Sequence, residues 1–271
     1  MSRKKVARYI FDDIPDEETK VTRWLKILEC DTAGRAIPLA IQTARENKLS
    51  YPEFLGLLLE QEMQEREDKR IERWRKQAHF PWVKNIDQYN FARPEFIEKD
   101  KILKLVECRW IENGGNVIFF GASGVGKTHL SIALGIEAIA KGYETRFITL
   151  DQLMELSSIA VGKDRAVGGG EYRKKFLSAF SNIKLLVLDD LAYTKIDPDV
   201  SDLLFQIIFR RHERKTSTIF TSNEGLDTWG RFFSNNEVRA MAVLDRVLHD
   251  CTPINIRGKS FRSAGLHLSP V

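Results

Sequence analysis

Apolar side chains recur at helical spacing along the first part of the chain. Two stripes follow the i, i+3, i+4, i+7 pattern that gathers side chains on one face of a helix. Their members are Val21, Trp24, Leu25 and Leu28, and then Ile37, Ala40, Ile41 and Ala44. Gly34 lies between the stripes and predicts a break, while Ser50 and Glu53 have capping-box spacing at the start of a third helix. Residues 1–78 are therefore expected to form a small all-helical domain.

Beyond residue 116, short apolar runs alternate with longer helical patterns. The runs have the length of single strands; they are Asn116–Phe120, Thr145–Leu150, Ile183–Leu188, Ser217–Thr221 and Thr252–Ile256. Strand and helix in alternation predict an α/β domain with a largely parallel sheet flanked by helices. Ligands bind at the carboxyl ends of the strands in such sheets. Pro81 disfavours helix in the residue before it, so this domain is expected to span residues 79–271.

Composition limits the class of protein. Hydrophobic residues make up 43% and charged residues 30% of the chain, which is a globular balance. No stretch approaches the roughly 18 apolar residues of a membrane span, and no apolar signal core follows the basic start. The three cysteines form no CxxC pair, so the sequence predicts neither a zinc ribbon nor a disulfide framework. We expect a cytoplasmic protein without a membrane partner.

The clearest motif is a phosphate-binding loop, which satisfies G-x-x-x-x-G-K-[ST] at every fixed position. Its residues are Gly121, Ala122, Ser123, Gly124, Val125, Gly126, Lys127 and Thr128. A strand candidate precedes the loop and a helical pattern follows it, so backbone N–H groups and a helix N-terminus are expected to face the phosphates. The motif predicts ATP as the ligand, with Lys127 at the β and γ phosphates and Thr128 binding Mg²⁺.

Two acidic residues end a later strand candidate. Asp189 and Asp190 follow the apolar run 184–188, as in a Walker B element. Asp189 is expected to hold the Mg²⁺ shell, and Asp190 to orient and polarise the attacking water. Asn223 follows the next strand candidate and is expected to reach the water beside the γ-phosphate. A turn or helix cap is the alternative for the acids, and a turn is the alternative for Asn223.

Basic clusters suggest nucleic acid as a partner, although the net charge is only +4. They lie at the end of the third helix and around the glycine run Gly168–Gly170, which predicts a mobile loop over residues 162–170. A solvated helix with i, i+4 ion pairs, or a plain surface loop, is the alternative. The candidate DNA contacts are Arg66, Arg70, Arg73, Lys76, Lys163, Arg165, Arg173 and Lys174.

The order of phosphate loop, Walker B element and strand-end Asn223 resembles that of an AAA+ ATPase. The chain is similar, more specifically, to the IstB-like helper ATPases of insertion-sequence transposition, within the DnaC/IstB clade. The resemblance extends from about residue 20 to residue 262. The segments that carry it are Ala78–Pro81, Tyr89–Phe91, Gly142–Phe147, Asp202–Gln206, Arg210–Arg214, Thr221–Asn223, Leu244–Arg246 and Ile254–Arg262.

The resemblance implies the AAA+ strand order and ATP bound between subunits. Asn223 matches the residue called sensor 1. Arg246 matches the position from which the family supplies an arginine finger to a neighbour's ATP, and Arg239 is the rival for that role. Tyr89 and Phe91 match a segment that approaches the adenine, with core packing equally open.

Two positions depart from the usual AAA+ pattern. Arg262 resembles the second-sensor arginine, but the helical lid that would follow it is expected to be absent. Asp190 stands where glutamate is commoner. Its shorter side chain, which also occurs in the IstB and DnaC groups, suits slow hydrolysis and an ATP-gated switch.

Together these features predict an ATP-dependent transposition helper that is also an ATPase. The protein is expected to self-associate on duplex DNA, remodel it, and recruit or activate a partner transposase, with hydrolysis driving disassembly. The helical domain is expected to serve DNA binding or self-association. The alternative is a DnaC-like replicative helicase loader that binds single-stranded DNA and a helicase. Asn223 and Arg246 disfavour a small-molecule kinase, which would share only the phosphate loop.

Overall fold

The computed structural model describes residues 17–191, 198–225, 228 and 237–261. The chain divides into two compact units, with the division between Arg73 and Trp74. It falls inside helix α4, a few residues before the boundary predicted after residue 78. Ala78 groups with the second unit, because its carbonyl oxygen accepts a hydrogen bond from the backbone N–H of Phe147 at 2.7 Å.

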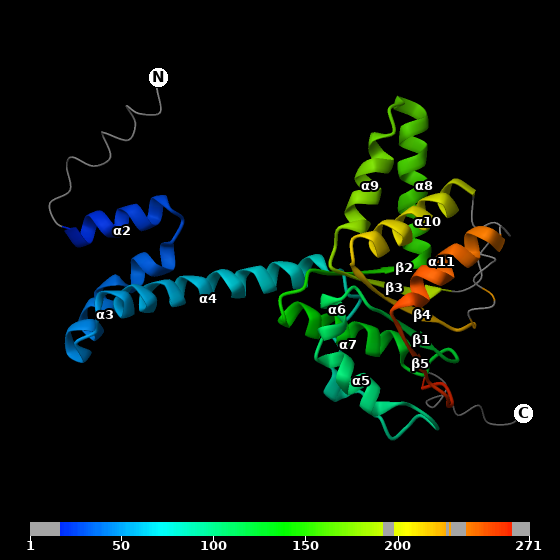
Figure 1. The fold of residues 1–271 in the computed structure, drawn as a ribbon, viewed down its shortest axis with the longest axis horizontal. Helices are drawn as coiled ribbons and strands as arrows, with labels where there is room; N and C mark the ends of the chain where they lie inside the picture. The colour runs from blue at the N-terminus through cyan, green and yellow to red at the C-terminus, as the bar shows by residue number, and fades with distance from the viewer. Residues whose placement is uncertain (1–16, 192–197, 226–227, 229–236, 262–271) are drawn as a thin grey trace, which may run out of the picture. The chain divides into compact units, whose positions relative to one another are not determined.

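The described part of the first unit is helical, as the apolar stripes predict (Figure 1). Its helices are α2 (Glu17–Ile27), α3 (Asp31–Asn47) and α4 (Tyr51–Gln77). The core is small and centres on Ile37, Ala40 and Leu58. The capping-box spacing is realised at the start of α4, where the carboxylate of Glu53 accepts a hydrogen bond from the Ser50 N–H at 2.7 Å.

The break predicted at Gly34 is wrong. Gly34 lies inside α3, and the chain turns before it at residues 28–30, where Glu29 has a φ of 57°. A Cβ atom at position 34 would lie 3.7 Å from the carbonyl oxygen of Thr22 and 3.8 Å from Cβ of Leu25. The glycine therefore sits against α2 and does not end a helix.

The second unit contains a five-stranded sheet in the order β2-β3-β4-β1-β5, and every strand pairing is parallel. All five predicted strands are confirmed. Each is five to seven residues long, the length that a short apolar run between turn residues allows. The strands are β1 (Asn116–Phe120), β2 (Thr145–Thr149), β3 (Leu185–Leu191), β4 (Ser217–Ser222) and β5 (Cys251–Asn255).

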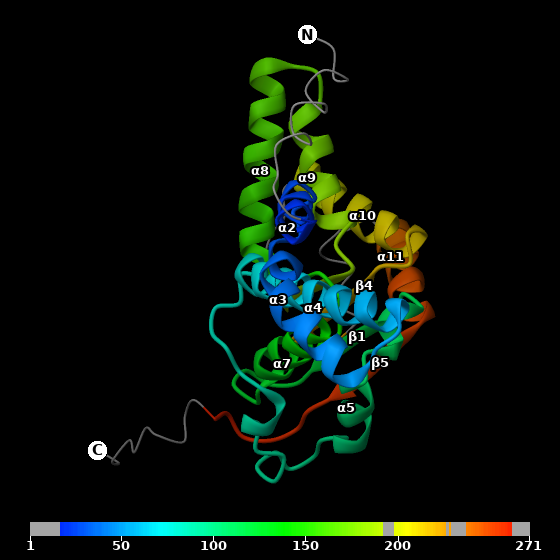
Figure 2. The same ribbon diagram turned by 90° about the vertical axis from the view of Figure 1, so that its left-hand side faces the viewer.

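Helices cover both faces of this sheet (Figures 1 and 2). Successive strand side chains alternate between the two cores: Val117 and Phe119 pack with α5 and α7, while Ile118 packs with α8 to α11. None of the described helices combines the length and apolar character needed to cross a bilayer. The helices are η1 (Ile86–Gln88), α5 (Lys99–Val106), α6 (Arg109–Glu112), α7 (Lys127–Ala140), α8 (Leu150–Val167), α9 (Glu171–Ser181), α10 (Pro198–Glu213) and α11 (Glu237–His249).

The mobile loop predicted over residues 162–170 is wrong, because α8 continues to Val167 and only Gly168–Gly170 form a turn before α9. The carboxylate of Asp164 is buried and accepts hydrogen bonds from the backbone N–H groups of Tyr172 at 2.9 Å and Arg173 at 2.8 Å. This carboxylate caps the first turn of α9, so a side chain within α8 fixes the path of the turn.

Candidate functional site

The phosphate loop joins β1 to α7 at the carboxyl edge of the sheet. Strands β3 and β4 end at the same edge, because β4 is parallel to β1 and β3 is parallel to β4. The structure therefore brings the loop together with Asp189 and Asp190 at the end of β3 and with Asn223 after β4. These residues are far apart in sequence, and the sheet order alone makes them neighbours.

Two glycines give the loop its path. Gly121 and Gly126 have φ values of 148° and 100°, in the region that favours glycine. An added Cβ would lie 2.3 Å from the carbonyl oxygen of Ile256 at position 121, and 2.6 Å from the Tyr89 ring at position 126. Gly126 is also the N-cap of α7 and has no side chain to cap it, so the first N–H groups of the helix can bind an anion.

The ammonium group of Lys127 contacts oxygen atoms of the loop and of Asn223. Its Nζ donates to the carbonyl oxygens of Gly121 at 2.7 Å and Ala122 at 2.9 Å, and to Oδ1 of Asn223. The residue is buried, so its charge is poorly solvated without such acceptors. A negatively charged ligand in the loop would offer the same donors a stronger partner.

Thr128 and Asp189 form the part of the site that suits a divalent cation. The Thr128 hydroxyl lies 3.0 Å from both carboxylate oxygens of Asp189. A hydroxyl and one carboxylate fit Mg²⁺, which takes only one or two protein carboxylates and completes its shell with phosphate and water oxygens. No group of three or more His, Cys, Asp or Glu able to hold a metal occurs among the described residues. The residues present therefore fit Mg²⁺ held together with a nucleotide, and not a metal held by protein alone.

The pKa of the Asp189 carboxyl is raised above its ordinary value, and burial is the largest cause. Hydrogen bonds from Thr221 and Thr128 lower this pKa and the charge of Asp190 raises it. A cation at Asp189 would therefore relieve a buried negative charge.

Asp190 points differently from Asp189 because the backbone bulges between them. The register between β3 and β4 shifts between Leu188 and Leu191, and Asp190 has a φ of 58° in the left-handed region. Its side chain is exposed, and its Oδ1 accepts a 3.3 Å hydrogen bond from Nδ2 of Asn223. Asp189 is thus buried beside Thr128, whereas Asp190 is exposed to solvent at the site.

Three further residues of the site have no role predicted from the sequence: Thr221 beside the two acids, and Ser260 and Phe261 beside the loop. The Thr221 hydroxyl contacts both acidic residues. The backbone N–H of Phe261 donates to the carbonyl oxygen of Gly124 at 2.8 Å, and Ser260 lies against the same glycine. For Thr221, its position at the end of a predicted strand was a sequence pattern that could have indicated a role. The contacts of residues 260 and 261 could not be predicted, because they depend on the course of the chain after β5. Arg262 and a lid after it lie outside the described residues.

Tyr89 packs against the phosphate loop at Val125 and Gly126. It is buried, its hydroxyl donates to the carbonyl oxygen of Val125 at 3.1 Å, and its ring lies 4.9 Å from that of Phe91 between centroids. Burial raises the pKa of Tyr89 to about 12, so the hydroxyl stays protonated as a donor. For Tyr89 the structure therefore favours the core-packing alternative.

Arg246 lies at the other end of the sheet from the loop of its own chain. Asn116, the first residue of β1, donates through Nδ2 to the carbonyl oxygen of Val247 at 3.1 Å. The phosphate loop follows the last residue of β1, about 15 Å away along the strand. The guanidinium of Arg246 donates to the carbonyl oxygen of Ala242 at 2.7 Å and lies 4.5 Å from the centroid of the Phe209 ring.

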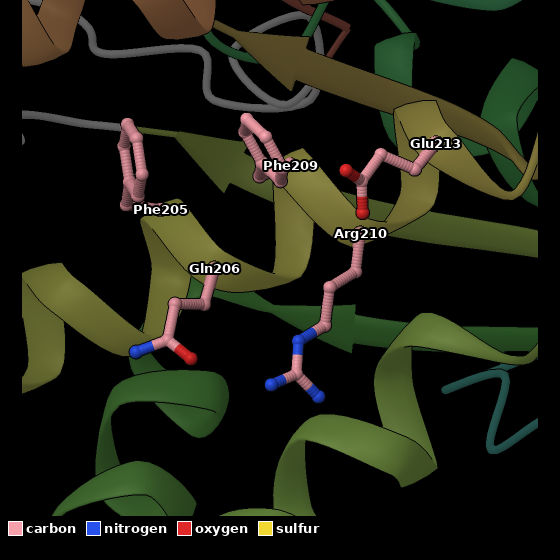
Figure 3. Close-up of a pocket in the computed structure, with 5 residues that line it drawn as sticks. All are labelled: Phe205, Gln206, Phe209, Arg210 and Glu213. Carbon is pink, nitrogen blue, oxygen red and sulfur yellow. The ribbon is translucent and has the colours of Figure 1, made fainter.

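Arg239 has a different environment on the same helix. It pairs with Asp202 at 3.2 Å and lies 5.5 Å from the centroid of the Phe205 ring. Helix α10 carries both aromatic rings, which are half-buried and line a hollow of about 280 Å³ (Figure 3). The residues that line it are Phe205, Gln206, Phe209, Arg210 and Glu213.

Five of the eight candidate DNA contacts have intramolecular partners that weaken their candidacy. Arg66 donates to Glu62 at 2.7 Å and to the carbonyl oxygen of Glu29 at 2.8 Å. The other such pairs are Arg70 with Glu67, Arg165 and Arg173 with Asp199, and Lys163 with the Tyr172 ring.

Two other candidates are available to a ligand. Arg73 and Lys174 are exposed, and neither forms an ion pair with a described residue. Lys76 is exposed as well but has an intramolecular interaction. The structure thus separates basic residues that have intramolecular partners from exposed ones that form no ion pair with a described residue.

The chain is similar to ATP-binding proteins of insertion sequences. A family model described as IstB-like ATP-binding protein matches residues 24–267. The ATP-binding protein of insertion sequence IS21 from Pseudomonas aeruginosa is 36% identical over 222 residues, 82% of this chain and 80% of that protein. The corresponding protein of IS5376 from Geobacillus stearothermophilus is 37% identical over 219 residues, 81% of this chain and 84% of the relative.

Solved structures agree on the fold. The crystal structure of the DnaC helicase loader matches with a TM-score of 0.50 and 26% identity, over 65% of this chain and 98% of that one. DnaI matches with a TM-score of 0.50 at 20% identity, over 65% of this chain and 89% of that one. The predicted α/β fold of an AAA+ P-loop NTPase is confirmed.

Proposed function

Because the chain belongs to the family of IstB-like ATP-binding proteins, we propose that it is an ATP-hydrolysing helper of insertion-sequence transposition. One observation carries the catalytic part of this proposal. Lys127, Asp190 and Asn223 form a connected set of hydrogen bonds at the carboxyl edge of the sheet, next to the pair Thr128 and Asp189. The residue types that bind phosphate, Mg²⁺ and the attacking water in ATP hydrolysis on a phosphate loop are present within this one site.

Each of these residues has a separate role in the proposed hydrolysis. Lys127 binds the β and γ phosphates, and Thr128 and Asp189 hold Mg²⁺, which when bound neutralises charge on the phosphate oxygens. Asp190, on the open side of the site, accepts a proton from the attacking water and orients it. Asn223 holds Asp190 in place through its amide and lies beside Lys127, so it fixes the water relative to the γ-phosphate.

Self-association would complete this site. Arg246 lies about one strand length from the phosphate loop of its own chain, too far for an arginine side chain to reach it. A second copy whose α11 end faces the loop would bring Arg246 to the γ-phosphate, where a guanidinium stabilises the transferring group. Arg246 is the better candidate than Arg239, because Arg239 is held in an ion pair with Asp202.

Duplex DNA and a transposase are the partners that we propose. The relatives at 36% and 37% identity are ATP-binding proteins of insertion sequences, and a mobile element needs a strand-transfer enzyme that this chain does not resemble. The exposed side chains of Arg73 and Lys174 suit contacts to phosphate, which carry no base sequence information. We place the protein in the cytoplasm, where its DNA substrate lies.

A helicase loader is the second candidate, favoured by the DnaC match over 65% of this chain. The experiment that separates the two measures ATP hydrolysis and ATP-dependent assembly on duplex and single-stranded DNA of the same length. The transposition helper is expected to assemble on the duplex and to hydrolyse ATP there. Preferential assembly on single strands would favour the loader, and absence of ATP hydrolysis on both would contradict the ATPase proposal.

A further inference from the structure

The hydroxyl of Thr221 lies between the two acidic residues of the site. It donates a 2.6 Å hydrogen bond to Oδ1 of Asp189 and accepts a 2.9 Å hydrogen bond from the backbone N–H of Asp190. The residue is 1% exposed, so water does not compete for these bonds. A hydroxyl has one proton to donate, and here that proton is directed to the buried carboxylate.

The backbone of β3 explains why this hydroxyl is needed. The β3–β4 register shifts between Leu188 and Leu191, so the N–H of Asp190 leaves the regular ladder. Asp190 also adopts a left-handed conformation, which is unfavourable for a residue with a Cβ and persists only where the surroundings hold it. The Thr221 hydroxyl provides an acceptor for that N–H and thereby holds the bulge in the conformation that separates the two acids.

We infer that Thr221 is a positioning residue, which sets the metal-binding carboxylate of Asp189 and the water-binding carboxylate of Asp190 relative to each other. The inference rests on the proposed function, because it takes the roles of the two acids from it. It adds that one side chain on β4 couples them, so a change at Thr221 alters both Mg²⁺ binding and the chemical step. ATP affinity should change little, since Thr221 makes no contact with the phosphate loop among the described residues.

Two substitutions of Thr221 distinguish a positioning role of its hydroxyl from a role in core packing. Thr221→Val keeps the shape and apolar contacts of the side chain but removes both hydrogen bonds, whereas Thr221→Ser keeps the hydroxyl. Thr145→Val is a matched control. Thr145 is also a buried threonine on the same sheet, but it begins β2 at the opposite edge, and its hydroxyl binds only the carbonyl oxygen of Tyr143 among the described residues, at 3.1 Å.

The experiment measures three quantities on the full chain for each variant: kcat, the Mg²⁺ concentration at half-maximal ATP hydrolysis, and Mg²⁺-dependent ATP binding at equilibrium. Thr221→Val is expected to lower kcat and to raise the half-maximal Mg²⁺ concentration by about tenfold each, the effect of losing a hydrogen bond to a charged group. The equilibrium affinity for ATP at saturating Mg²⁺ should change by less than about threefold. Thr221→Ser should recover most of both losses.

The result that overturns the inference is a Thr221→Val protein whose kcat and Mg²⁺ dependence match those of Thr145→Val, whatever its melting temperature. Such a protein would show that the hydroxyl serves stability alone. If the unmodified protein hydrolyses no ATP, the proposed function fails, but the equilibrium binding arm still decides the inference. In that arm, Thr221→Val must require more Mg²⁺ for ATP binding than both the unmodified protein and Thr145→Val.

Discussion

Asn223 and Lys127 are joined directly: the lysine ammonium group donates to Oδ1 of the amide, whose Nδ2 in turn donates to Asp190 at 3.3 Å. The amide therefore links the residue proposed to bind phosphate to the residue proposed to bind water. A γ-phosphate oxygen is a stronger acceptor for the ammonium group than an amide oxygen. Binding of ATP would then release Oδ1 of Asn223 to the attacking water, which would make Asn223 a sensor of the bound phosphate.

Asn223→Ala is expected to retain ATP binding and to lose most hydrolysis, by about a hundredfold. The reason is that the loop and Lys127 remain, while the group that places the water is gone. Equilibrium ATP binding and single-turnover hydrolysis measure the two effects. Equal loss of binding and hydrolysis would show that Asn223 holds the loop and does not sense the phosphate.

Lys127→Ala and Asp190→Asn should fail at different steps. Loss of the Lys127 ammonium group removes the phosphate contact, so Mg²⁺-dependent ATP hydrolysis should disappear together with productive binding. Asp190→Asn leaves the loop and Asp189 unchanged, so ATP should still bind while turnover falls by about 10²–10⁴-fold, the range for loss of a general base. An Asp190→Asn protein that cannot bind ATP would mean that Asp190 is structural or a metal ligand.

Much of the fold was predictable because its signals are local. Each strand is one apolar run, and the loop motif occupies eight consecutive residues, so neither depends on distant contacts. The errors arose where a glycine lies inside a helix. Gly34 packs α3 against α2, and Gly162 lies within α8 with open space beside it, while the carboxylate of Asp164 fixes the turn that follows.

The residues of the candidate site were predictable from the sequence, but the hydrogen bonds between them were not. The loop, the two acids and Asn223 were identified from motifs and strand ends. The role of Thr221 was not, because it depends on β3 lying next to β4 and on a bulge that no residue pattern announces. The pairing of Arg165 with Asp199 was likewise hidden, since it joins residues 34 positions apart.

The raised pKa of Asp189 gives a prediction about stability. Because burial raises the pKa of this carboxyl in the folded protein, the folded state binds a proton there more readily than the unfolded state. Its contribution to stability is therefore full at acidic pH and is lost as the pH rises through the folded-state pKa. At neutral pH, without nucleotide, the buried charge of Asp189 should destabilise the fold.

Asp189→Asn should therefore raise the melting temperature of the nucleotide-free protein at pH 7, and the gain should shrink as the pH is lowered. A gain of about 1 kcal/mol corresponds to roughly 2–4 °C for a chain of this size. The same variant should lose the additional stabilisation that Mg²⁺ and ATP give the unmodified protein. Thermal unfolding at several pH values, with and without Mg²⁺ and ATP, measures both. A lower melting temperature at pH 7 would show that hydrogen bonds from Thr128 and Thr221 outweigh the burial.

The place of Arg246 predicts complementation between two inactive proteins. Arg246→Ala should bind ATP but should neither hydrolyse it nor assemble with ATP. Mixed with Lys127→Ala, it should partly restore turnover, because one interface in the mixture pairs an intact loop with an intact arginine. Arg239→Ala serves as the control on the same helix and should retain activity. No recovery despite demonstrated co-assembly counts against a trans-acting role, and a defect in Arg239→Ala alone would transfer the role to Arg239.

The charge pattern predicts how DNA binding depends on salt. Binding dominated by phosphate contacts should weaken linearly in log affinity against log salt, with a slope of about −0.9 for each phosphate neutralised on duplex DNA. Arg73→Ala and Lys174→Ala should each reduce the slope by up to about one per subunit and weaken all duplex sequences alike, because both side chains are exposed and form no ion pair with a described residue. Fluorescence anisotropy with ATP over a salt series gives affinity and slope together.

Arg66→Ala is the informative control, because Arg66 was a candidate on the same helix as Arg73. Its guanidinium binds Glu62, which is buried and accepts hydrogen bonds from the backbone N–H groups of Thr32 at 3.0 Å and Ala33 at 3.1 Å. Removing Arg66 leaves that carboxylate without its ion pair, so the melting temperature should fall. The salt slope should stay unchanged at temperatures where the variant is folded. A flat salt dependence in the unmodified protein would refute phosphate-dominated binding altogether, and a reduced slope in Arg66→Ala would return this residue to the DNA contacts.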